Sequence, residues 1–62
     1  MELTGKEVSK VEMMFKLMEY ESLTDWEDHF VLSVSDQFDV KGDLTRAQYE
    51  KLDEVFKRAA ER

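Results

Sequence analysis

The chain contains no cysteine and no proline, only two glycines, and no long run of apolar residues. Without cysteine it forms neither a disulfide nor a cysteine-ligated zinc site. Without proline, none of its helices is kinked by that residue. No segment approaches the roughly 18 consecutive apolar residues of a membrane-spanning helix. The N-terminus also lacks the charged and then apolar pattern of a signal peptide. We therefore expect no membrane partner and a cytoplasmic location.

The length of 62 residues predicts one domain, covering residues 1–62. A chain this short buries only about 60% of the surface that it exposes when unfolded, so its stability is marginal. Because no disulfide is available, additional stability must come from good helix packing, from self-association or from docking on a partner.

The net charge is −6, and it is unevenly distributed along the chain. Residues 1–22 carry five acids and three bases, residues 23–43 carry six acids and one base, and residues 44–62 carry four acids and five bases. Non-specific binding to phosphate backbones requires a positive field, so the overall charge argues against it. The acidic middle segment is compatible with a basic protein partner.

A Leu-Thr-x-x-Glu/Gln pattern occurs three times, beginning at Leu3, Leu23 and Leu44. This is the pattern of a capping box, in which the Thr side chain accepts a bond from the backbone three residues later and the Glu or Gln reaches back. Gly42 suits the left-handed position that follows a helix end. The chain is thus predicted to be an all-α, three-helix domain with helices at about 5–20, 25–41 and 46–60.

Apolar residues at helical spacing in each segment predict the core. The expected core residues are Val11, Phe15, Met18, Trp26, Phe30, Val34, Phe38, Leu52, Val55 and Phe56. Trp26 is open to a second interpretation, because in the first turn of a helix it can also be an exposed contact residue. So small a core leaves apolar residues over, and the candidate interaction surface consists of Met13, Leu17, Tyr20, Trp26 and Leu32.

Two groups of residues resemble known functional sites, a calcium-binding loop and a catalytic triad. Aligning Gly42 with the sixth position of an EF-hand loop puts Lys41 at a ligand position and Gln48 where a bidentate Glu is required. His29, Ser33 and Asp36 share a helix face, but nothing in the sequence supplies an oxyanion site or a third group that orients the base. We therefore expect no catalytic, metal-binding or cofactor-binding residues, a surface position for His29, and a protein that is not an enzyme.

Contact with nucleic acid is a less favoured alternative. The third segment offers Lys51, Lys57 and Arg58 to phosphates, but these bases are mixed with acids. In a helix–turn–helix arrangement the acidic second helix would have to cross the DNA backbone, which is electrostatically unfavourable. The reverse idea is an acidic mimic of DNA, in which phosphates are imitated by Asp25, Glu27, Asp28, Asp36, Asp39 and Asp43.

Two blocks, Leu-Thr-Asp-Trp-Glu at 23–27 and Leu-Thr-x-x-Gln at 44–48, carry a family resemblance, together with Phe30, Ser33, Val34, Gln37, Leu52, Val55 and Arg58. On these residues the segment 23–58 resembles a short helical module of small phage proteins and of some bacterial DNA-processing proteins. Asp25 stands where the module has Glu, and residues 38–43 are more acidic than its basic linker. The resemblance implies no established activity and no functional residues.

Taken together, these features favour a small, non-enzymatic protein-interaction module. The resemblance suggests a phage accessory protein that acts on a DNA-processing complex in the host cytoplasm. Its partner is expected to be another protein or a second copy of the chain. The alternatives are an acidic DNA-mimic inhibitor and a weak nucleic-acid-binding protein.

Overall fold

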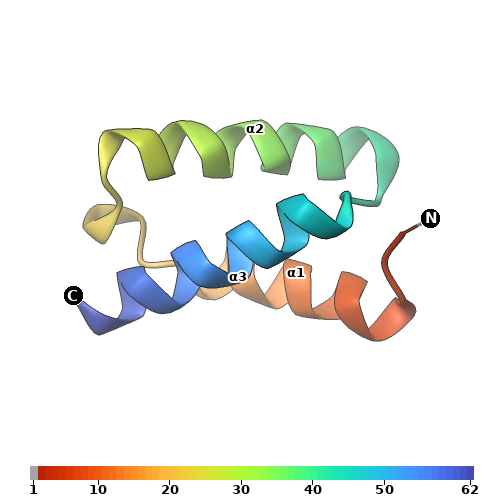
Figure 1. Ribbon diagram of the computed structural model, residues 1–62, viewed down its shortest axis with the longest axis horizontal. Helices are drawn as coiled ribbons and strands as arrows, with labels where there is room; N and C mark the ends of the chain where they lie inside the picture. The colour runs from red at the N-terminus through yellow and green to blue at the C-terminus, as the bar shows by residue number, and fades with distance from the viewer. Residues whose placement is uncertain (1) are drawn as a thin grey trace.

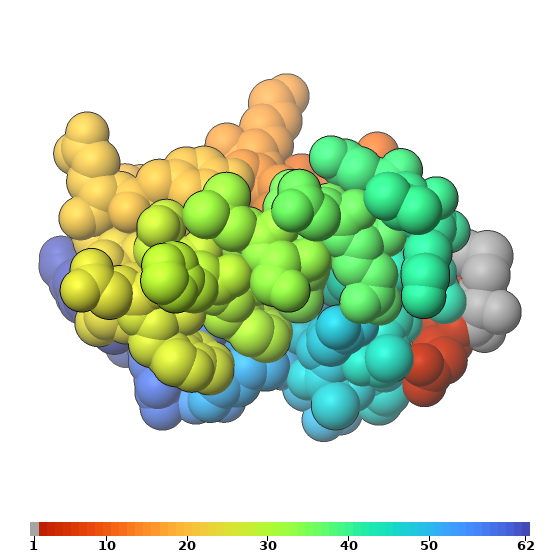
Figure 2. Space-filling model, turned by 90° about the horizontal axis from the view of Figure 1, so that it is seen from above, coloured from red at the N-terminus to blue at the C-terminus, as the bar shows by residue number. Residues whose placement is uncertain are grey.

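A computed structural model describes residues 2–62, which form three α-helices and, in this range, no strand. The helices are α1 (Gly5–Leu17), α2 (Asp25–Lys41) and α3 (Arg46–Glu61), and a single-turn 3-10 helix, η1 (Tyr20–Ser22), joins the first two. Figure 1 shows that α1 and α3 run in the same direction while α2 runs the opposite way. Seen from above α2, α1 lies along one edge of the molecule and α3 along the other (Figure 2). The prediction of an all-α, three-helix fold is confirmed.

The first helix is shorter than expected. It ends at Leu17 instead of continuing to residue 20, because Met18 adopts an extended conformation with ψ of 134°. In a longer helix, the Phe15 carbonyl would accept a bond from the backbone N–H four residues later. The Tyr20 hydroxyl, 2.6 Å from that oxygen, donates the bond instead. The prediction for α2 was correct, and α3 ends one residue later than expected, at Glu61.

All three helices begin with a capping box. In each, the Thr side chain accepts from the N–H three residues later and the side chain of that residue accepts from the Thr N–H, as Thr24 and Glu27 do at 3.2 and 2.9 Å. Gly42 follows α2 with a φ of 66°, where its N–H donates to the Phe38 carbonyl. The helix starts and the end of α2 are therefore determined locally, by residues within a few positions of one another.

The core lies between the three helices and contains fewer aromatic residues than expected. Of the expected members, Val11, Met18, Val34, Leu52 and Val55 are buried. The four phenylalanines are half-buried around them, and the prediction of Trp26 as a core residue is wrong. The buried apolar residues also include Leu3, Met14, Val31, Leu44 and Ala59. Leu3 and Leu44 directly precede capping threonines, so the residues before two of the helices contribute side chains to the core.

Each capping residue also binds a second helix. Glu27, buried at the start of α2, accepts two bonds from the Arg62 guanidinium after the end of α3, at 2.5 and 3.1 Å. Gln48 in α3 exchanges two amide bonds with Gln37 in α2, at 2.8 and 3.0 Å. A capping residue thus fixes both the start of its own helix and the position of a neighbouring helix.

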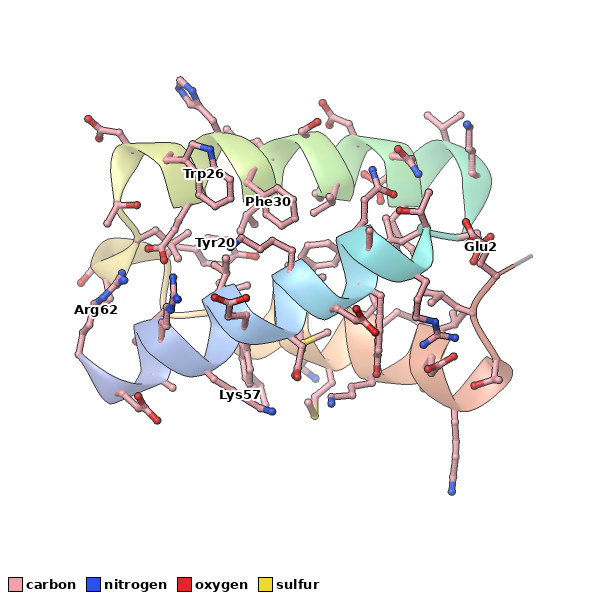
Figure 3. The ribbon with its side chains drawn as sticks, in the orientation of Figure 1. Glu2, Tyr20, Trp26, Phe30, Lys57 and Arg62 are labelled. Atoms are coloured by element: carbon pink, nitrogen blue, oxygen red, sulfur yellow. The ribbon has the colours of Figure 1, made fainter. Side chains whose placement is uncertain are left out.

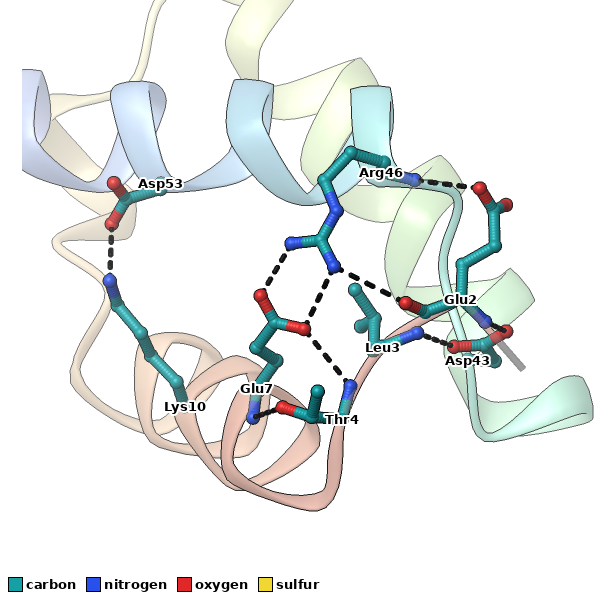
Figure 4. A network of polar contacts seen from close by, with 8 residues as sticks. All are labelled: Glu2, Leu3, Thr4, Glu7, Lys10, Asp43, Arg46 and Asp53. Carbon is teal, nitrogen blue, oxygen red and sulfur yellow. Dashed lines mark hydrogen bonds and ion pairs between the residues drawn. The ribbon is translucent and has the colours of Figure 1, made fainter.

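The same arrangement holds the N-terminal segment at the other end of the bundle. Arg46, at the start of α3, pairs with the capping carboxylate of Glu7 and donates to the Glu2 carbonyl at 3.3 Å (Figure 4). Asp43, in the loop before α3, accepts the backbone N–H groups of Glu2 and Leu3 at 2.9 and 3.2 Å. These bonds hold Leu3 in its buried position.

The capping boxes make a direct prediction about stability. Replacing Thr24 with alanine removes the acceptor for the Glu27 N–H and should destabilise the protein by about 1 kcal/mol. For a domain of this size, that loss lowers the melting temperature by roughly 4–8 °C. Thermal melts followed by circular dichroism would measure it, with Thr24→Ser as the control that keeps the hydroxyl. An unchanged melting temperature in the alanine variant would contradict this role.

Candidate interaction surface

Trp26 is the most conspicuous side chain on the surface. It is the second residue of α2, and 57% of it is exposed. Phe30, one turn later, stacks on it with ring centroids 5.4 Å apart and an angle of 8° between the planes. Figure 3 shows both rings on the side of α2 that faces α3. Trp26 is the solvent-exposed member of this stacked pair, since Phe30 is half-buried against the core.

Helix α3 completes this surface with charged side chains. The Lys51 ammonium lies 5.2 Å from the centre of the Trp26 ring, within the range of a cation–π contact. Lys51 also pairs with Glu54 at 3.7 Å, and Glu54 pairs with Arg58 at 2.6 Å. We call these five residues (Trp26, Phe30, Lys51, Glu54 and Arg58) the aromatic face.

The backbone beneath the aromatic face is held from several sides. Glu27, the neighbour of Trp26, is tied to Arg62, whose guanidinium also donates to the Ser22 carbonyl at 2.7 Å. Further along, the amide pair of Gln37 and Gln48 fixes α2 against α3. Trp26 is therefore exposed on a rigid support, so binding would require little ordering of the chain.

The capping carboxylates are the most perturbed ionisable groups. The bond from Arg62, together with the Thr24 N–H, lowers the pKa of Glu27 from 4.5 to about 2. Arg46 and the Thr4 N–H do the same for Glu7, whose pKa is also about 2. Both carboxylates have a structural role, since their ion pairs hold helices together.

The five residues predicted as an interaction surface are all exposed, but the structure does not gather them on one side. Leu32 lies six residues after Trp26, which turns it about 120° around α2. Met13 and Leu17 lie one turn apart on α1, and the hydroxyl of Tyr20 is bonded to that helix. Of the five, only Trp26 belongs to the aromatic face. Val40, which is 84% exposed near the end of α2, was not among them.

The three bases proposed for nucleic-acid contact do not lie on one side of α3. Lys51 and Arg58 are seven residues apart and share the aromatic face. Lys57 lies on another side of α3, where it pairs with Asp53 at 3.0 Å, and Asp53 also pairs with Lys10 of α1 at 3.2 Å. The three bases therefore do not form a single basic patch.

The row of acids proposed as a DNA mimic is shorter than the sequence suggested. Glu27 is buried against Arg62, and Asp43 binds the N-terminal backbone, whose N–H groups lower its pKa. The four others are exposed, namely Asp25, Asp28, Asp36 and Asp39. The prediction that His29 lies at the surface is confirmed.

No family model, curated protein or solved structure matched the chain when it was compared with each of these sets. Within residues 2–62, no three His, Asp or Glu side chains are grouped so that they could hold a metal ion. None of the helices in this range has the length and apolar character needed to cross a membrane.

Proximity across the fold is what the sequence did not reveal. The pairing of Trp26 with Phe30 has a signal in the sequence, because residues four apart on a helix are neighbours. The contact of Lys51 with Trp26 joins two helices and has no local signal. The spacing therefore indicates that the two aromatic rings are neighbours, while the charged half of the aromatic face emerged only from the fold.

Proposed function

We propose that the protein is a small, non-enzymatic protein-interaction module that binds its partner through the aromatic face. The exposure of Trp26 on a rigid support is the observation that carries this proposal. Tryptophan and arginine are enriched among the residues that dominate binding energies at protein interfaces, and the aromatic face contains one of each. The adjoining charges, Lys51 and Glu54, would form a polar rim around the aromatic stack.

The resemblance of residues 23–58 to the helical module of phage and DNA-processing proteins supports a more specific version. In this version, the protein is a phage accessory factor that binds a component of a DNA-processing complex in the host cytoplasm. Its net charge of −6 favours contact with a protein of that complex over contact with the nucleic acid itself.

The proposal predicts that binding depends on Trp26. If Trp26 is an interface anchor, Trp26→Ala should weaken partner binding by about 2 kcal/mol or more, the range of interface hot spots. The immobilised protein would be used to capture partners from host lysate, with mass spectrometry to identify them. Leu32→Ala is the matched control, because Leu32 is equally exposed on the same helix but on another side.

Retention of the same proteins by the Trp26→Ala variant would contradict a role for the aromatic face. Equal loss with Leu32→Ala would instead point to general surface hydrophobicity. Circular dichroism of both variants would establish that the helices are intact. Because both side chains are largely exposed, neither substitution should change helix content.

A further inference from the structure

The charges beside Trp26 follow a regular order along α3. Lys51, Glu54, Arg58 and Glu61 are separated by three, four and three residues, and their signs alternate. Residues three or four apart lie on the same side of a helix. The ion pairs of Glu54 with Lys51 and with Arg58 show that Glu54 lies beside both bases. We call these four residues the charge row.

The charge row is complementary to itself. Its spacing is the same when read from either end, whereas its signs are opposite. When two copies of α3 lie antiparallel about a two-fold axis, Glu54 of each faces Arg58 of the other, and Lys51 of each faces Glu61 of the other. A two-fold interface requires this self-complementarity, because the same patch is used on both subunits.

We propose that the aromatic face is the interface of a homodimer, in which two antiparallel α3 helices pair through the charge row and bury Trp26. This inference rests on the proposed function, since it names the partner of that same surface. In the dimer the row would set the alignment, and the aromatic stack would supply apolar area removed from water.

The alternating signs of the charge row favour a second copy of the chain over a partner segment of a single charge sign. A partner segment of a single charge sign would meet like charge at two of the four positions, and like charges placed opposite one another are unfavourable. The Lys51 ammonium beside Trp26 also belongs to the row, so the aromatic stack and the row meet the partner together. A dimer would supply the additional burial that a chain of 62 residues needs.

The single tryptophan of the chain reports on this interface directly. Molar mass would be measured by light scattering after gel filtration, from about 1 μM to about 1 mM, a range that covers weak and moderate complexes. We expect the mass to rise towards twice that of the chain, and the Trp26 emission to shift to shorter wavelength over the same range. A monomer mass at the highest concentration would overturn the dimer.

Two charge reversals test the alignment itself. In Glu54→Lys the facing groups would be lysine and arginine, and in Arg58→Glu they would both be glutamate. Each variant alone should therefore associate at least tenfold more weakly than the wild type. When the two are mixed, every facing pair has opposite signs again, so the mixture should associate with nearly wild-type strength. Rescue in the mixture cannot arise from pairing within one chain.

Matched controls carry the same changes of charge elsewhere. Glu12→Lys and Lys16→Glu alter exposed residues of α1 and should leave association unchanged. Failure of the mixture to exceed its two components would overturn the proposed alignment, as would equal weakening by the controls. A monomeric wild type that still captures another protein through Trp26 would overturn the dimer and leave the proposed function standing. If the protein neither self-associates nor captures another protein through Trp26, the dimer and the proposed function are both overturned.

Discussion

Replacing Leu52 with alanine should remove a large part of the stability of this protein. Leu52 lies in the middle of α3, and none of its surface is exposed. Truncating a buried leucine to alanine loses its transfer free energy and leaves a cavity, which together destabilise by about 2–5 kcal/mol. At the usual stability per residue, a chain of this length has roughly 3–9 kcal/mol in total. The variant should therefore unfold at a much lower urea concentration than the wild type.

Urea unfolding followed by circular dichroism would measure this loss. Leu32→Ala is the control, since it removes the same atoms from a side chain that is 57% exposed. Its effect should stay within about 0.5 kcal/mol, as is usual for surface positions. Similar midpoints for the two variants would mean that the core is not where the structure places it.

Acid should destabilise the protein strongly, and within a defined interval. The pKa of Glu7 and that of Glu27 are both about 2 in the folded protein, compared with 4.5 for the free side chain. Each lowered pKa means that the folded state binds a proton less readily than the unfolded chain. The resulting stabilisation is fully present above the unfolded pKa and is lost as the pH falls from about 4.5 to about 2. The melting temperature should therefore fall steeply across this interval.

Removing the arginines would identify the source of the acid sensitivity. Arg62→Gln and Arg46→Gln each delete the largest cause of a lowered pKa, so each should flatten part of the dependence of melting temperature on pH. Lys16→Gln, which removes an exposed cation of α1, provides the matched control. A profile that is equally steep in the wild type and in both arginine variants would contradict the role of these ion pairs.

The starts of the helices were predictable because they are local. Each capping box lies within four residues, so its pattern can be read directly from the sequence. The end of α1 was not predictable in this way, because residues 18–22 contain no glycine or asparagine that would mark a helix end. Tyr20 bonds the Phe15 carbonyl only because the chain turns at Met18.

Trp26 shows why an apolar repeat can mislead. The repeat of Trp26, Phe30, Val34 and Phe38 has a period of four, whereas a helix turns once in 3.6 residues. Each step therefore advances about 40° further around the helix, and three steps move Trp26 about 120° away from Phe38. The sequence could not show which end of the repeat faces the core.

The charged half of the aromatic face depends on which helices become neighbours. Lys51 reaches Trp26 across the contact of α2 with α3, and Arg62 reaches Glu27 from 35 residues away in the sequence. Charge spacing along a single helix can be read from the sequence, because Glu54 and Arg58 stand four residues apart and pair in the structure. Contacts between helices require the packing, which the periodicity of a single segment does not specify.

The double use of the capping residues has a consequence for cooperativity. In most helices the first turn can fray without disturbing the rest of the protein. Here, opening the first turn of α1, α2 or α3 would also release Arg46, Arg62 or Gln37, respectively, from another part of the fold. Partial opening would therefore lose local and tertiary bonds together, which raises its free energy towards that of complete unfolding. For this reason, three short helices with a small core can behave as one all-or-none unit.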